Sequence, residues 1–145
     1  MAQATYQDAE ILLKLYDLRR EERLRAARAW VPANFSASTV AEVMEKYPPG
    51  SDQNAYFRMV AGYWDMAASL VVHGVLHEEI FFEASGEMLM VWEKMKDFIA
   101  DLRRQRKNPT LFRNLEKAAT RQIEWLNRQG PEAYDTMKIM FAPKK

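Results

Sequence analysis

Apolar residues recur along this chain at steps of three and four positions, the spacing of one face of an α-helix. Glycine, proline or a capping residue separates the segments that carry this pattern. Taken in order, they predict helices over about residues 6–31, 40–47, 52–73, 78–85, 88–102, 109–129 and 131–141. No stretch shows sustained period-two alternation. The pattern therefore predicts an all-α fold, a single-domain helical bundle of six to seven helices over residues 1–145 without a sheet.

The first predicted helix, over residues 6–31, is the longest. Its apolar stripe runs through Leu13, Leu24 and Val31, and Pro32 ends it because proline disfavours α geometry in the residue before it. Further apolar residues widen the stripe in the first half, namely Ile11, Leu12, Leu15 and Leu18. We therefore expect the first half of this helix to be more buried than the second.

Signals for helix ends support the other segments. Thr39 and Glu42 have the spacing of a capping box, in which the threonine oxygen accepts from an early amide while the glutamate reaches back to the cap amide. Ser51 or Asp52 can cap the next helix. Gly74 is suited to end that helix, because glycine readily adopts the left-handed conformation of a helix C-terminus.

The charge balance shows no strong basic or acidic character. The 145 residues include 21 Lys and Arg against 20 Asp and Glu, a formal net charge of +1. Basic residues cluster over positions 19–28 and 103–113, but acidic residues interleave the first cluster and precede the second. Because non-specific nucleic-acid binding depends on neutralising many phosphates, we do not expect a nucleic-acid partner.

Cysteine is absent, which excludes disulfides and thiolate chemistry and fits a reducing compartment. The longest apolar stretch covers residues 59–76 and is interrupted by Asp65, His73 and Gly74. It falls short of the roughly 20 apolar residues that a membrane-spanning helix needs. We therefore expect a cytoplasmic protein without a membrane span.

The two histidines, His73 and His77, are the weak candidates for a metal site. Their four-residue spacing would place both imidazoles on one face of a continuous helix, as zinc proteases require. The zinc-protease motif has Glu directly after its first histidine, whereas this chain has Gly74, which also favours a break between the two. The alternative places His73 in the last turn of one helix and His77 at the start of the next.

Motifs for catalysis are scarce. Glu78, Glu79, Glu83 and Glu87 form a carboxylate cluster, yet the chain contains none of the Glu-x-x-His pairs that build di-iron sites in helical bundles. The sequence also lacks a glycine-rich phosphate loop and a GxSxG nucleophile motif. It therefore favours a protein without catalytic activity and without a cofactor, although chemistry by Glu, Tyr or Arg stays open.

The apolar residues are unusually rich in methionine and aromatic side chains, with 9 Met, 4 Trp, 6 Tyr and 7 Phe. Most of them lie at helical spacing and are expected in the core. Methionine and the aromatic residues are also enriched at adaptable interfaces and pocket walls. The candidates for an interface or a pocket are Trp30, Tyr47, Trp64, Trp92, Met137, Met140 and Phe141.

A series of motifs between about residues 54 and 125 carries a family likeness. They are the aromatic pair 56–57, the turn 74–79, Trp92, the arginine pair 103–104 and residues 112–115. In these motifs the chain resembles a family of small bacterial helical proteins of unknown function. The resemblance implies no catalytic residues, and relatives more often have an acidic cap where this chain has His77. It also implies a membrane anchor near the N-terminus of many relatives, whereas this chain begins with a charged amphipathic helix.

Two functional hypotheses follow from the sequence. The first is a cytoplasmic helical module for protein–protein interaction or regulation that binds another protein or a second copy of itself. The second is a binding protein for a small apolar ligand, held in a pocket between helices that Trp, Tyr and Met side chains line.

Overall fold

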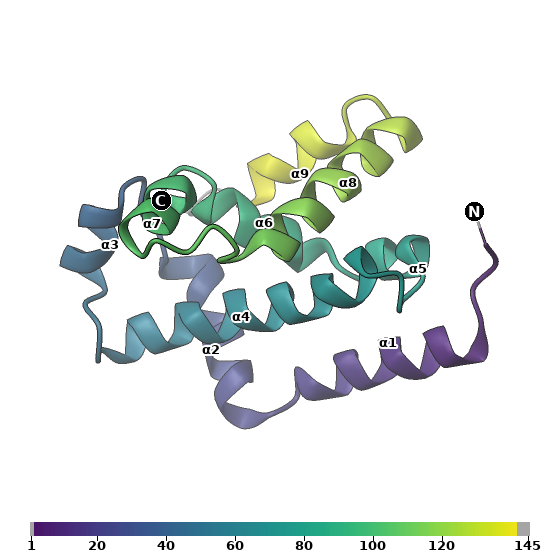
Figure 1. The fold of residues 1–145 in the computed structure, drawn as a ribbon, viewed down its shortest axis with the longest axis horizontal. Coiled ribbons are helices and arrows are strands. Elements are labelled where there is room, and N and C mark those ends of the chain that lie inside the picture. The colour runs from purple at the N-terminus through teal and green to yellow at the C-terminus, as the bar shows by residue number, and fades with distance from the viewer. Residues whose placement is uncertain (1, 142–145) are drawn as a thin grey trace.

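The computed structural model describes residues 2–141, which form nine α-helices and no strand (Figure 1). Their bounds are α1 Tyr6–Leu18, α2 Glu22–Asn34, α3 Val40–Lys46, α4 Asp52–Val72, α5 Glu78–Glu83, α6 Gly86–Met95, α7 Ile99–Gln105, α8 Arg113–Gln129 and α9 Ala133–Phe141. The all-α prediction is confirmed, whereas the predicted count of six to seven helices is too low. None of the helices in the described part is long and apolar enough to cross a membrane.

The first additional helix arises because the predicted helix over residues 6–31 is broken at residues 19–21. Glu21 starts α2 by accepting the backbone amides of Arg23 and Leu24 on its carboxylate, at 3.0 and 2.8 Å. Pro32 lies inside α2 instead of ending the helix before it. Proline is tolerated there because Pro32 lies close to the C-terminus of α2. Its missing amide removes one helical hydrogen bond, the one to the Arg28 carbonyl.

The second additional helix arises from a break at residues 96–98, which turns α7 away from the axis of α6 and toward α3 (Figure 1). The following helix, α8, begins at Arg113 and not at the predicted Asn108–Pro109 pair. Asn108 instead caps a turn by accepting the amide of Thr110 at 3.0 Å. Asp65 of α4 accepts the amide of Leu115 at 2.9 Å, so the first turn of α8 is capped from another helix.

Several predicted helix ends are confirmed. Thr39 caps α3, although Glu42 accepts the amide of Ser38 instead of the cap amide, and Ser51 caps α4. Gly74 ends α4 with φ +76°. Its amide donates to Val71 while the next amide donates to Leu70, the paired bonds of a Schellman motif.

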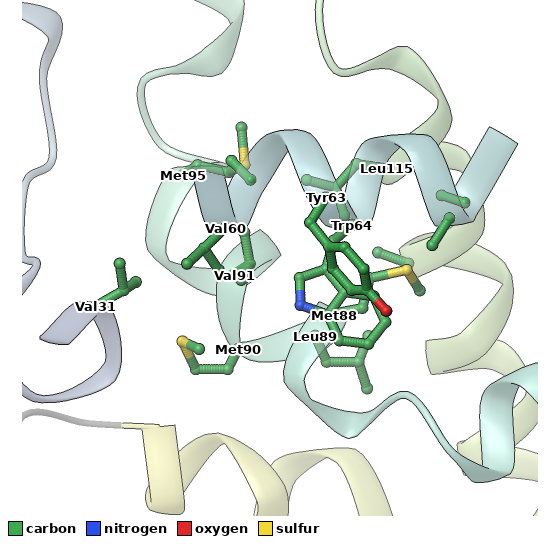
Figure 2. Close-up of a cluster of buried hydrophobic side chains, with 14 of the residues drawn as sticks. Val31, Val60, Tyr63, Trp64, Met88, Leu89, Met90, Val91, Met95 and Leu115 are labelled. Carbon is green, nitrogen blue, oxygen red and sulfur yellow. The ribbon is translucent and has the colours of Figure 1, made fainter. Parts of the chain in front are cut away.

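The core is built around α4, which packs against α2 on one side and α8 on the other (Figure 1). Trp64 of α4 is completely buried, and Met88 and Leu89 of α6 lie close to it in Figure 2. Leu115 contributes from α8 and Val31 from α2. The buried apolar side chains form one continuous cluster from α1 to α9.

Helix α1 runs along the outside of this core, beneath α4 in the view of Figure 1. Only Asp8 and Leu15 of α1 are buried, whereas α2 buries Leu24, Ala27 and Val31. The expectation that the first half of this region is the more buried one is therefore wrong. Of the residues expected to widen the stripe, Leu15 is buried, Ile11 and Leu12 are half-buried against the core, and Leu18 is exposed. Leu13, predicted on the buried stripe itself, also faces outward.

Candidate functional site

An apolar cavity of about 180 Å³ lies where α3, the first turns of α4, α7 and the loop between α7 and α8 meet. We call it the α3–α7 cavity. It is lined by Val40, Val43, Met44, Asn54, Phe57, Arg58, Phe98, Leu102, Arg106, Leu111 and Phe112. Its walls thus come from two stretches of the sequence, residues 40–58 and 98–112, each of which contributes two segments.

The walls of the cavity are fixed by packing. Val40 and Val43 sit on the buried face of the short helix α3, and Phe57 and Phe98 are almost completely buried. The ring of Phe57 stacks on that of Phe35 with centroids 4.1 Å apart. An apolar cavity of about 150 Å³ in another protein accepts benzene, so this one has room for a single ring or a short acyl chain.

The mouth of the cavity carries its polar groups. Asn54 is 9% exposed, donates its side-chain amide to the Tyr47 carbonyl at 2.9 Å and accepts the Nε–H of Arg58 at 2.9 Å. Arg58 is thereby held against the first turn of α4. Arg106 lines the same mouth from the end of α7. Within residues 2–141 neither arginine forms an ion pair with a carboxylate.

The loop that closes the cavity holds two residues in the left-handed backbone region. They are Lys107 with φ 52° and Phe112 with φ 55°, and apart from glycines no other residue in the described range has a positive φ. Such conformations cost free energy for residues with a Cβ and cluster at ligand-binding positions. Here they bracket the segment that places Leu111 and Phe112 on the cavity wall.

The two histidines have different structural roles at two different helix ends. His77 caps α5: its Nδ1 accepts the amide of Ile80 at 3.5 Å, and its Nε2 lies 2.8 Å from the Ala2 carbonyl. His73 is the exposed C-cap of α4, separated from His77 by the turn at Gly74. Among residues 2–141, no group of three or more His, Cys, Asp or Glu side chains is arranged to hold a metal ion.

The predicted interface and pocket residues do not form one site, although Trp30 and Tyr47 contact each other. Trp64 is a core residue, whereas Trp30 packs at the edge of the core, with its ring 5.6 Å from that of Tyr47. Trp92 is half-buried on α6. On α9, Met137 and Phe141 are half-buried and Met140 is exposed. None of these seven side chains lines the α3–α7 cavity, whose walls are mainly Val, Leu and Phe.

One sequence signal could have indicated the cavity. Asn54 shares the buried face of α4 with Phe57, so a polar residue interrupts an apolar stripe. Arg58 follows one turn later, at the spacing that lets the two side chains interact on a helix. The two left-handed residues carry no such signal, because Lys and Phe are not typical of that conformation.

A second feature of interest is the outward face of α1. Tyr6, Leu13 and Tyr16 are 90%, 69% and 53% exposed, and with Ala9 they follow the alternating three- and four-residue spacing of a coiled-coil seam. We call these four residues the α1 stripe. Large apolar side chains that line up in this way on a surface mark an interaction site more often than scattered ones do.

Comparison with known proteins gives a family. The sequence profile of a domain of unknown function, DUF4760, matches residues 4–122. The match confirms the family resemblance and extends it toward the N-terminus, so that it includes α1 and every residue that lines the α3–α7 cavity. No curated protein and no solved structure matches the chain.

Proposed function

We propose that this chain, which belongs to the DUF4760 family of unknown function, is a binding protein for a small apolar molecule held in the α3–α7 cavity. The observation that carries the proposal is the cavity itself. It is walled by buried Val and Phe side chains, closed by a strained loop and opened to solvent past two arginines. Concave, mostly apolar sites with a few polar groups at one end are the usual form of small-molecule sites.

The composition of the lining supports binding over catalysis. No carboxylate, histidine or hydroxyl group lines the α3–α7 cavity, so its walls offer no general base and no hydroxyl nucleophile. Its polar side chains are one amide, from Asn54, and two guanidinium groups. A guanidinium stays protonated in proteins and therefore orients a ligand without exchanging protons with it.

Toluene is a suitable probe for this proposal, because it has the size and apolar character of the cavity. We expect it to shift the methyl NMR signals of Val43, Leu102 and Leu111 and to leave Val75 unchanged, since Val75 lies in the turn beyond the opposite end of α4 from the cavity. Val43→Phe, which fills the cavity, should abolish the shifts. Val75→Phe adds the same volume at an exposed valine and should retain them. Identical toluene shifts in the two variants, or none in the natural chain, would refute the proposal.

The α1 stripe favours a second function, self-association of two copies of this chain. In an antiparallel pair of α1 helices centred on Ile11, Tyr6 faces Tyr16 of the second copy and Ala9 faces Leu13. Each large leucine thus meets a small alanine, which lets the two seams interlock. Apart from Ala9, the side chains brought together are large and exposed in the single chain.

The charges on α1 favour a second copy of the chain, and not a lipid surface, as the partner of the α1 stripe. Helix α1 carries three acidic residues and one lysine, so anionic headgroups would repel it. In the antiparallel pair, Lys14 and Glu10 of the second copy are offset by about 3 Å along the helix axis, because the helix rises 1.5 Å per residue. The two symmetry-related Lys14–Glu10 pairs flank the stripe and favour this orientation.

Sedimentation at micromolar concentration tests self-association. The natural chain should sediment as a dimer, and Leu13→Glu should convert it to a monomer by burying a carboxylate in the seam. Leu18→Glu is the matched control, because Leu18 is also exposed but lies on the other side of α1. A monomeric natural chain, or equal effects of the two substitutions, would contradict dimerisation through the α1 stripe.

A further inference from the structure

We infer that the ligand of the α3–α7 cavity is a small carboxylate, with one ring or a short acyl chain in the cavity and its anionic group on Arg58 and Arg106. This inference rests on the proposed binding function and adds the chemical class of the ligand. It draws on three features of the cavity and its mouth. They are the orientation of Arg58, the lack of an ion pair at Arg106 within residues 2–141 and the volume of the cavity.

Arg58 is held in an orientation that suits a carboxylate. Its Nε–H donates to Asn54 Oδ1 at 2.9 Å, and the other end of the Asn54 amide is fixed by the Tyr47 carbonyl. Because Asn54 is nearly buried, it anchors the guanidinium plane from within the structure. Within residues 2–141 the two terminal nitrogens of Arg58 have no hydrogen-bond or ion-pair partner, and they form the fork that binds both oxygens of a carboxylate.

The three arginines at the end of α7 divide according to whether they line the cavity. Arg103 donates to Glu116 at 2.6 Å, and Arg104 is paired with Asp101. Arg106 lines the cavity and forms no ion pair within the described part of the chain. Local acidic residues therefore pair with the two arginines that do not line the cavity, whereas no carboxylate within residues 2–141 pairs with Arg106 at its mouth.

The volume of the cavity limits the apolar part of the ligand. About 180 Å³ is close to the volume that accepts benzene elsewhere and is too small for a long fatty-acyl chain. The charged groups are confined to the mouth, since the deeper lining residues Val40, Phe57 and Phe98 are apolar. A ligand with an apolar body and an anionic end matches both parts.

Benzoate and benzamide provide a direct test, because they have nearly the same shape and differ in charge. In a calorimetric titration of the full chain at low salt, benzoate should bind about tenfold more tightly than benzamide, the advantage expected for a charge-assisted hydrogen bond. Arg58→Gln and Arg106→Gln should each reduce that preference. Arg128→Gln removes an exposed arginine at the far end of α8 and should leave the preference unchanged.

The outcomes separate this inference from the proposed function. Equal affinity for benzoate and benzamide, with methyl shifts at Val43 and Leu102, would overturn the anionic class and leave cavity binding intact. Binding of neither ligand would overturn both. A benzoate preference that survives Arg58→Gln and Arg106→Gln but is lost in Arg128→Gln would place the anion outside the cavity and would also overturn the inference.

Discussion

Arg19 is the most unusual single residue, because it is a buried cation without a carboxylate partner in the described chain. It is 8% exposed, and its guanidinium carbon lies 4.6 Å from the ring centroid of Trp64 and 4.9 Å from that of Tyr16. Its Nε donates to the Tyr63 hydroxyl at 3.1 Å. That hydroxyl in turn donates to the Leu15 carbonyl, so one tyrosine connects α4 to the end of α1.

Tyr63→Phe tests this connection. Removing the hydroxyl leaves the Arg19 Nε and the Leu15 carbonyl without a partner, and an unsatisfied buried group costs about 1–3 kcal/mol. We expect the free energy of unfolding in urea to fall by about that amount. Tyr56→Phe is the control, because the Tyr56 hydroxyl forms no hydrogen bond within residues 2–141. Equal losses in the two variants would show that the hydroxyl has no such role.

Asp8 joins α1 to the turn after α4 and introduces a pH dependence. Its carboxylate accepts the backbone amides of Thr5 at 2.8 Å and His77 at 2.9 Å. These two hydrogen bonds hold the pKa of Asp8 below its ordinary value of 3.8, against a smaller opposing effect of burial. Because the pKa is lower in the folded chain, Asp8 stabilises the fold above pH 3.8, and this stabilisation is lost as the pH falls through the folded-state pKa.

Urea unfolding at a series of pH values measures this effect. Asp8→Asn should lower the stability at pH 7, and its stability should fall less steeply than that of the natural chain below pH 4. Asp97→Asn, at an exposed aspartate, should retain the natural pH profile. A profile unchanged by Asp8→Asn would mean that the hydrogen bonds to Thr5 and His77 do not contribute to stability.

Sequence patterns could not separate these special residues from ordinary ones. Arg19 and Arg28 look like their neighbours in a charged cluster, yet Arg19 is buried and Arg28 pairs with Glu87, 59 positions away, at 2.8 Å. The α3–α7 cavity is similar, because its walls come from four segments whose meeting depends on tertiary packing. Only the Asn54–Arg58 pair is local enough to be read from helical spacing.

At the scale of elements, the sequence predicts where helices lie but not the two breaks that divide predicted helices into shorter ones. Gly74, Ser51 and Thr39 mark ends through local chemistry, and the structure uses all three. The breaks at residues 19–21 and 96–98 contain neither glycine nor proline, so no local rule marks them. The start of α8 was also missed, because Asp65 supplies its cap from another helix.

Gly62 inside α4 and Gly74 just beyond its C-cap provide a matched test of how the helix ends. Gly74 has φ +76°, where a side chain is strained, and Gly74→Ala should destabilise the chain by roughly 1–2 kcal/mol. Gly62 lies in the middle of α4 with open space around its Cα. Gly62→Ala should therefore stabilise the chain by about 0.5–1 kcal/mol through helix propensity. Opposite shifts in the thermal midpoint are expected, and shifts of the same sign would contradict this account of Gly74.

At the scale of the whole molecule, buried packing is concentrated in a centre and is sparse at α1. Helices α4 and α8 pack along each other, and their fully buried side chains, including Trp64 and Leu115, meet Met88 and Leu89 of α6 in the centre. Helix α1 is attached to the centre mainly through Asp8, Leu15 and Arg19. Segments with few buried contacts open locally at a lower free-energy cost than the whole molecule does.

Native-state hydrogen exchange should resolve this gradient. The amides of α4 and α8 should exchange only through global unfolding, whereas those of α1 should exchange faster through local detachment. Leu15→Ala should speed exchange in α1 much more than in α8, since Leu15 is a buried apolar contact between α1 and the centre. Leu13→Ala shortens a leucine on the outward face and should leave the exchange of a single chain unchanged.

The same experiment links the gradient to the proposed dimer. If the α1 stripe pairs with a second copy, the α1 amides should become more protected as the protein concentration rises, because association favours the closed form of α1. Protection of α4 should rise as well, because α4 exchanges through global unfolding and association stabilises the folded chain against it. If α1 exchanged as slowly as α4 in a dilute sample, α1 would be an integral part of the core and the gradient would be wrong.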